Sequence, residues 1–136
     1  MGRVSDKIVE IEKYLSELEE IAPMSLEEYL VKFEKRLACE RAFEKIVEAI
    51  NDLAILFIKE KKLPIPSEDI KAFEVLSEKN FIPQNLAQRL KEAKGMRNVL
   101  IHQYREVNNE LVFEAIDKEI LKDAKDFIKE LEKGLV

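Results

Sequence analysis

The chain has 136 residues and a formal net charge of −5, with 23 Lys and Arg residues against 28 Asp and Glu residues. This length fits one compact domain over residues 1–136, and the charge argues against a general nucleic-acid coat protein. A single cysteine excludes an intrachain disulfide and favours a cytoplasmic setting. The longest apolar stretch, residues 46–58, is interrupted by Glu48, Asn51 and Asp52. It falls short of the roughly 20 residues that span a bilayer, so we expect no membrane segment.

The first half of the chain is predicted to be helical. A first helix with one buried face is indicated by apolar residues at helical spacing: Ile8, Ile11, Leu15 and Leu18. Pro23 marks a break, and Ser25 then begins a capping-box pattern. From Ser25 to about Lys61 the apolar spacing predicts one long helix. Its apolar surface widens along its length, which suggests a central element that touches several neighbours or a second subunit.

Proline, serine and asparagine residues divide the second half of the chain into shorter helices. Breaks are expected at Leu63–Pro66, where Ser67 is a suitable N-cap for the next helix, at Asn80–Pro83, and at Asn108 and Asn109. The predicted helices are Ser67–Lys79, Pro83–Gln103 and Asp117–Lys133, the last one ended by Gly134. No segment alternates apolar and polar residues as a strand does. The sequence therefore predicts an all-α, up-and-down bundle of about five helices.

One segment of this acidic chain is basic. Five basic residues and one acidic residue lie between positions 86 and 105: Arg89, Lys91, Lys94, Arg97, Arg105 and Glu92. The segment carries a net charge of +4 within a chain of −5, so the remainder carries −9. The segment also contains the only histidine of the chain, His102. This concentration makes it the first candidate for a functional site.

Helical geometry sorts the polar residues of this segment into two groups. At about 100° per residue, Arg97 and Tyr104 fall within about 20° of each other. Asn98 and His102, four positions apart, are direct neighbours on the helix surface. Arg97 and His102 are about 140° apart, so spacing alone does not bring their side chains together. A joint role requires the long arginine side chain, a distorted helix end, or a second copy of the motif that faces this one.

These residue types suit a limited chemistry. Arginine offers a fixed fork of donors to phosphate oxygens, and histidine exchanges protons near neutral pH. Asparagine can orient the imidazole or bind a phosphate oxygen. One histidine and one distant cysteine do not form a zinc pattern, and the segment has no acidic cluster, so we expect no metal. Arginine and histidine without a metal suit cleavage of RNA, where the neighbouring 2′-hydroxyl is the nucleophile.

Structural interpretations of the same residues remain open. A lone histidine near a helix end often caps carbonyl groups or fills a half-buried space. A basic cluster is often an ordinary solvated face. Cys39, in a helical context, is interpreted as a small buried hydrophobe.

The stretch from Arg97 to Tyr104 resembles the R-x4-H-x-Y signature of HepT-like HEPN proteins. Segments on both sides also resemble this family: Ala49–Ala54, Leu63–Pro66, Phe73–Leu76, Leu86–Leu90 and Asn109–Phe113. Together they cover roughly residues 46–113, and the order of arginine, histidine and tyrosine makes the match more specific than the arginine–histidine pair alone.

The resemblance implies a homodimeric HEPN-like bundle that acts as a metal-independent RNA endonuclease, the toxin of a toxin–antitoxin pair, with no cofactor. It implies that Arg97 stabilises the phosphate charge, that His102 handles the proton, and that Asn98 sets the geometry. It also implies that a minimal nucleotidyltransferase (MNT) antitoxin attaches AMP to Tyr104. Contacts to RNA phosphates are expected from basic residues of the same segment: Arg105, Lys94 and Lys91.

Two other functions are compatible with these residues. The chain could be the non-catalytic subunit of a two-component nucleotidyltransferase and present nucleotide or substrate to it. It could also be a structural helical dimer without chemistry, in which replacing His102 would change stability alone.

Overall fold

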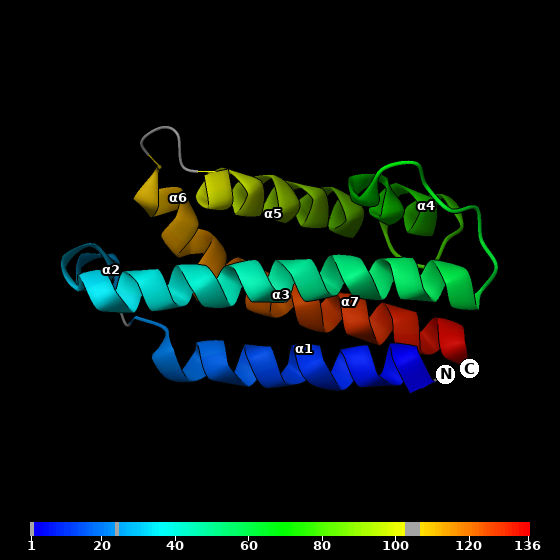
Figure 1. The fold of residues 1–136 in the computed structure, drawn as a ribbon, viewed down its shortest axis with the longest axis horizontal. Helices are drawn as coiled ribbons and strands as arrows, with labels where there is room; N and C mark the ends of the chain where they lie inside the picture. Colours follow the sequence, from blue (N-terminus) through cyan, green and yellow to red (C-terminus); the bar gives the residue numbers. More distant parts are fainter. Residues whose placement is uncertain (1, 24, 103–106) are drawn as a thin grey trace.

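Four long helices form the body of the molecule. The computed structural model describes residues 2–23, 25–102 and 107–136. The long helices are α1 (Gly2–Ile21), α3 (Phe33–Glu60), α5 (Gln84–His102) and α7 (Ile120–Leu135). They pack side by side and alternate in direction (Figure 1), and the described part of the chain contains no strand. The prediction of an all-α, up-and-down bundle is therefore confirmed.

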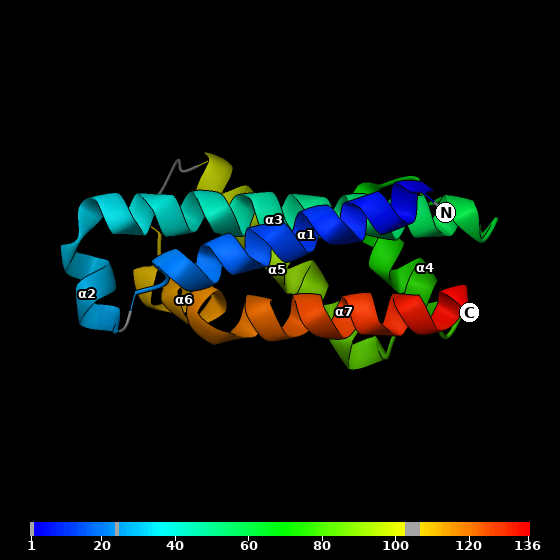
Figure 2. The ribbon, with the colours of Figure 1, turned by 90° about the horizontal axis from the view of Figure 1, so that it is seen from below.

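Shorter elements close the two ends of the bundle. One end carries α2 (Leu26–Val31) and α6 (Asn109–Glu114), and the other carries α4 (Ala72–Glu78) together with both chain ends (Figures 1 and 2). A short 3₁₀ helix, η1 (Asp69–Lys71), leads into α4. Within the described ranges, no helix is long and apolar enough to cross a membrane.

The long helix α3 is the central element, as its widening apolar surface predicts. It contacts α1, α2, α4, α5 and α7 (Figure 2). Its second half is buried on several sides at once, through Ile46, Val47, Ile50, Leu53, Ala54, Phe57 and Ile58. Burial of each of the larger apolar side chains contributes about 1.5–3 kcal/mol. Much of the packing energy of the bundle therefore comes from contacts between α3 and its neighbours.

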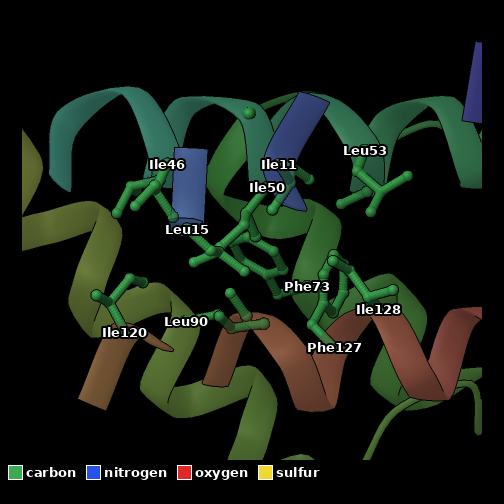
Figure 3. Packing of buried hydrophobic residues seen from close by; sticks show 14 of the residues in the cluster. Ile11, Leu15, Ile46, Ile50, Leu53, Phe73, Leu90, Ile120, Phe127 and Ile128 are labelled. Atoms are coloured by element: carbon green, nitrogen blue, oxygen red, sulfur yellow. The ribbon is translucent and has the colours of Figure 1, made fainter. Parts of the chain in front are cut away.

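A continuous apolar core joins the long helices and α4. Figure 3 shows Ile11 and Leu15 of α1 beside Ile50 of α3, above Phe73 of α4 and Phe127 of α7. The two phenyl rings meet edge to face, with centroids 5.8 Å apart and an interplanar angle of 79°. Aromatic pairs favour this arrangement because the ring edge is positive and the ring face negative.

The prediction of one helix from Ser25 to about Lys61 is wrong at one point, because the chain bends at Lys32. The Ser25 hydroxyl accepts a hydrogen bond from the Glu28 amide, as predicted, and begins α2. Lys32 then leaves the helical region, with φ −89° and ψ 88°. The bend brings the Tyr29 hydroxyl to within 3.3 Å of the Glu40 carboxylate. In a straight helix, eleven residues would separate these positions by about 16 Å.

The helices predicted to begin at Ser67 and Pro83 both begin later, and the second, α5, begins at Gln84. Glu68, not Ser67, is the N-cap of η1, and the regular α-helix starts only at Ala72. The loop is held from α3, where the Asn51 amide donates to the Asp69 carbonyl at 3.0 Å. Asn80 has φ 65°, a left-handed conformation that asparagine tolerates, and it turns the chain toward α5. The predicted end of α5 at Gln103 lies outside the described residues.

The last helical segment is longer than Asp117–Lys133 at both ends. Asn108 caps α6 by accepting a hydrogen bond from the Leu111 amide at 3.2 Å. The chain continues through a π-helical turn, η2 (Ala115–Glu119), into α7. Gly134 does not end the helix but lies inside it. A Cβ atom there would come within 2.8 Å of the Phe81 ring, so glycine permits a close approach instead of a stop.

Candidate functional site

The motif predicted to carry chemistry lies at the C-terminal end of α5. Arg97, Asn98 and His102 occupy the last two turns of that helix, at the end of the bundle that holds α2 and α6 (Figure 1). The predicted modification residue Tyr104 and the predicted RNA contact Arg105 lie outside the described residues. The site is therefore built from α5 and from the helices packed against it.

Arg97 is held between its sequence neighbour and α3. Its Nη2 lies 2.9 Å from Oε2 of Glu48, a residue of α3. Its Nη1 donates to Oδ1 of Asn98 at 3.1 Å. The Nε atom is buried, and the described residues supply it with no hydrogen-bond partner. With 23% of its side chain exposed, Arg97 faces the bundle and not open solvent.

Lys94 shares the same carboxylate. One turn before Arg97, its side chain is buried and its Nζ lies 3.5 Å from Oε2 of Glu48. A buried ammonium group needs an acidic partner, and Glu48 provides it. The structure thus brings together two of the predicted residues on α5, Lys94 and Arg97, around one carboxylate from α3.

The other basic residues of α5 are directed elsewhere. Lys91 forms an ion pair with Glu74 of α4. Arg89 donates from Nε to Oδ1 of Asp123 on α7 at 3.0 Å. The positive charge of this helix is therefore divided among three neighbouring helices. Of the predicted RNA contacts, only Lys94 lies beside Arg97 among the described residues.

His102 occupies a different side of the helix from Arg97. It is the last residue of α5 and is exposed, whereas Leu100 points into the core. Val99 and Ile101 are 56% and 42% exposed. The end of α5 thus turns Arg97 toward α3 and leaves Val99, Ile101 and His102 exposed on other parts of its surface.

A charged hollow adjoins Arg97 between α1, α3 and α5, with a volume of 170 Å³. Side chains of both signs line it, among them Lys7 of α1 and Asp52 of α3, whose charged atoms are 3.7 Å apart. Burial raises the pKa of the Asp52 carboxyl above its ordinary value, and nearby Lys7 opposes that shift. The described residues contain no group of three or more potential metal ligands.

Glu48 is the member of the site that sequence reasoning missed. In the sequence it is one of three polar residues that interrupt an apolar stretch. A signal was present, because an acidic residue inside the apolar stretch of a central helix favours a basic partner on a neighbouring helix. The basic segment of α5 is the richest source of such partners, because the rest of the chain carries a net charge of −9.

The arrangement supports binding of an anion at Arg97 and proton transfer at His102. Nη1 donates to Asn98, Nη2 forms an ion pair with Glu48, and Nε is buried, so the N–H groups left for phosphate oxygens are those on the two terminal nitrogens. The exposed imidazole is accessible to a substrate that approaches from outside the bundle.

Comparison with known proteins identifies relatives over nearly the whole chain. The family model described as ribonuclease HepT-like matches residues 11–131. The tRNA nuclease HepT of Aphanizomenon flos-aquae is 30% identical over 106 residues, which cover 78% of this chain and 72% of the relative. The mRNA nuclease HepT of Shewanella oneidensis is 32% identical over 85 residues, covering 62% of this chain and 63% of the relative.

Solved structures show the same fold. A tri-AMPylated Shewanella oneidensis HEPN toxin, solved in complex with MNT antitoxin, superposes with a TM-score of 0.87 at 24% identity over 96% of both chains. A toxin–antitoxin crystal structure with AMP-PNP gives a TM-score of 0.85 at 23% identity, covering 94% of this chain and 96% of the other. At these identities the likeness concerns the fold.

Proposed function

The chain belongs to the ribonuclease HepT-like family, and from that premise we propose that it is a metal-independent RNA endonuclease toxin of a HEPN/MNT-type toxin–antitoxin pair. Its active site would lie in a cleft between two copies of α5. The observation that carries this proposal is the division of the motif between two faces of the helix, with Arg97 turned toward α3 and His102 exposed.

The proposed reaction uses the RNA's own 2′-hydroxyl. Its oxygen forms a bond to the adjacent phosphorus, while the bond from phosphorus to the 5′-oxygen of the next nucleotide breaks. One proton leaves the 2′-hydroxyl and one proton reaches the departing 5′-oxygen, and His102 is the group suited to proton transfer. Arg97 stabilises the negative charge that develops on the phosphate oxygens, and Asn98 fixes the orientation of Arg97.

A second copy of the chain would complete this site. Arg97 and His102 of one helix point about 140° apart, so one phosphate is more easily reached by groups from two facing helices. Val99, about 60° from His102 around the helix, is 56% exposed, and a partner helix that approaches His102 would cover this apolar side chain. Both features support a homodimer with two motifs in one cleft.

Control of the toxin is proposed to act through Tyr104. An AMP group on its hydroxyl would add bulk and negative charge two positions after His102, which would repel an RNA phosphate. The related Shewanella toxin has been solved in an AMPylated state with an MNT antitoxin. We propose that an antitoxin of this class modifies Tyr104, and that Arg105, Lys94 and Lys91 assist RNA binding as local positive charges.

A ribonuclease assay of the unmodified wild type against His102→Ala tests the proposal. Loss of a general acid–base typically lowers the rate by about 10²- to 10⁴-fold, and we expect a decrease in this range. Because His102 is exposed at the end of α5, we expect the variant to remain folded, which urea unfolding of both proteins checks. Two results would contradict the proposal: wild-type protein that leaves many RNA substrates intact, or a variant that cleaves as fast as the wild type.

A further inference from the structure

We propose that Glu48 is a positioning residue for RNA cleavage, which fixes the Arg97 guanidinium from α3 in the orientation that receives the phosphate. The inference rests on the proposed ribonuclease function. It concerns a residue on a different helix from the motif, one that reaches the reacting atoms only through Arg97.

Two contacts on different nitrogens restrain the guanidinium. Glu48 forms an ion pair with Nη2 at 2.9 Å, and Oδ1 of Asn98 accepts a hydrogen bond from Nη1 at 3.1 Å. With Asn98 alone, the group could still rotate about that single contact, because the arginine side chain has several rotatable bonds. The contact from α3 removes this freedom before substrate binds, which is how positioning groups accelerate a reaction.

The charge balance of the cluster leaves Arg97 attractive to phosphate. Glu48 contributes one negative charge, whereas Lys94 and Arg97 contribute two positive charges around the same carboxylate oxygen. The cluster therefore keeps a net charge of +1. Without Lys94, the ion pair between Glu48 and Arg97 would be neutral and would compete with the substrate for the guanidinium.

Glu48 also pairs with a buried residue, so its replacement affects stability as well as position. Its side chain is 46% exposed as a whole, but the Oε2 atom that faces Arg97 and Lys94 is buried. Because Glu48→Ala leaves the buried Lys94 ammonium without its acidic partner, urea unfolding of the variant is measured first and kcat is compared at a temperature where both proteins are fully folded.

Steady-state RNA cleavage by Glu48→Ala tests the inference, with Glu44→Ala as the matched control. Glu44 lies one turn earlier on the same face of α3, lines the same hollow and pairs with Arg41 instead of Arg97. We expect kcat of Glu48→Ala to fall by about tenfold or more with KM not raised, since a misplaced group costs up to about 10²-fold. Glu44→Ala, which removes the same charge, should stay within about twofold of wild type, and Glu48→Asp should recover part of the lost kcat.

Three outcomes would overturn the inference. An unchanged or higher kcat in Glu48→Ala would mean that the carboxylate holds Arg97 idle or has no effect on it. Equal losses in the variants of Glu48 and Glu44 would mean that net charge alone matters. A raised KM with unchanged kcat would mean that Glu48 supports binding of substrate and transition state alike.

A second measurement separates this inference from the proposed function. Phenylglyoxal modifies accessible arginines, and its rate at Arg97 can be followed by mass spectrometry in a His102→Ala background, where no cleavage is needed. We expect severalfold faster modification of Arg97 when Glu48→Ala is added, and no change when Glu44→Ala is added. If the rate at Arg97 is the same in all three proteins, Glu48 does not hold the guanidinium, whatever the ribonuclease assay shows.

Discussion

Two helices of this bundle distribute their side chains in opposite ways. In α7 the apolar stripe is turned inward and buried, through Ile120, Ala124, Phe127, Ile128 and Leu131. In the last two turns of α5, Val99 and Ile101 are exposed while the charged Lys94 is buried and Arg97 is largely covered. Both helices pack against the same core, so their position in the fold does not account for the difference.

The contrast separates residues that hold the fold together from residues retained for another purpose. Covering charged groups and exposing apolar ones both cost free energy in an isolated chain. A sequence that departs from the usual pattern in this way is expected to do so at a functional site. The end of α5 is such a place, whereas α7 buries one charged residue, Asp123, paired with Arg89, within an otherwise apolar stripe.

The largest effect predicted by this contrast is the loss of Phe127. Its ring is fully buried against Phe73, and Phe127→Ala should lower the free energy of unfolding by about 3–5 kcal/mol. Val99→Ala, at an exposed position of α5, should change the stability of the single subunit by no more than about 0.5 kcal/mol. Denaturation in urea at several protein concentrations measures both and separates subunit stability from dimer stability. A loss at Val99 comparable to that at Phe127 and independent of protein concentration would contradict the position of Val99 on the surface of the subunit.

Replacing two glycines that lie inside helices should change the free energy of unfolding by smaller amounts, with opposite signs at the two positions. A Cβ at Gly134 in α7 would lie 2.8 Å from the Phe81 ring and 3.0 Å from the Phe57 ring, whereas a Cβ at Gly95 in α5 would meet nothing within 4 Å. Gly134→Ala should destabilise the fold by about 1 kcal/mol or more through overpacking. Gly95→Ala should stabilise it by about 0.5–1 kcal/mol, because alanine loses less backbone entropy in a helix.

Thermal or chemical unfolding of these two variants side by side tests whether α5 is less tightly packed than α7. If Gly134→Ala raised the stability as much as Gly95→Ala, the close approach of α7 to the two phenylalanine rings would not constrain the helix.

The fold was largely predictable because apolar spacing reports burial directly. The stripe on α1, the central role of α3 and the cap at Ser25 all follow from local sequence, and the structure confirms them. The bend at Lys32 was not predictable in this way. At the bend, Tyr29 packs on Phe113, which lies far along the chain, and its hydroxyl donates to Glu40. Such contacts leave no periodic signal.

The site was predictable in part for a related reason. The motif on α5 is contiguous, so helical spacing alone predicts that Arg97 and His102 lie on different sides of the helix. The partner of Arg97 is on α3, 49 positions earlier, and no local pattern connects the two. Charge complementarity between an acid inside an apolar stretch and a basic helix was the usable signal, and it requires knowing which helices touch.

The smallest predicted effect lies where the two contrasted helices meet. Burial raises the pKa of the Glu119 carboxyl above its ordinary value of 4.5, and the carboxylates of Glu114, Asp123 and Glu92 raise it further. Because the folded-state pKa is raised, the contribution of Glu119 to stability is present below the ordinary value and is lost as the pH rises through the raised one. Glu119→Gln removes this loss.

We therefore expect Glu119→Gln to be more stable than the wild type at pH 7 and equal to it at pH values below 4.5. Urea denaturation of both proteins across this range measures the gap. A gap of the same size at both ends would assign the gain to helix propensity and not to charge. A gap that opens only as the carboxyl ionises would show that the junction of α5 and α7, like the end of α5, tolerates an electrostatic cost.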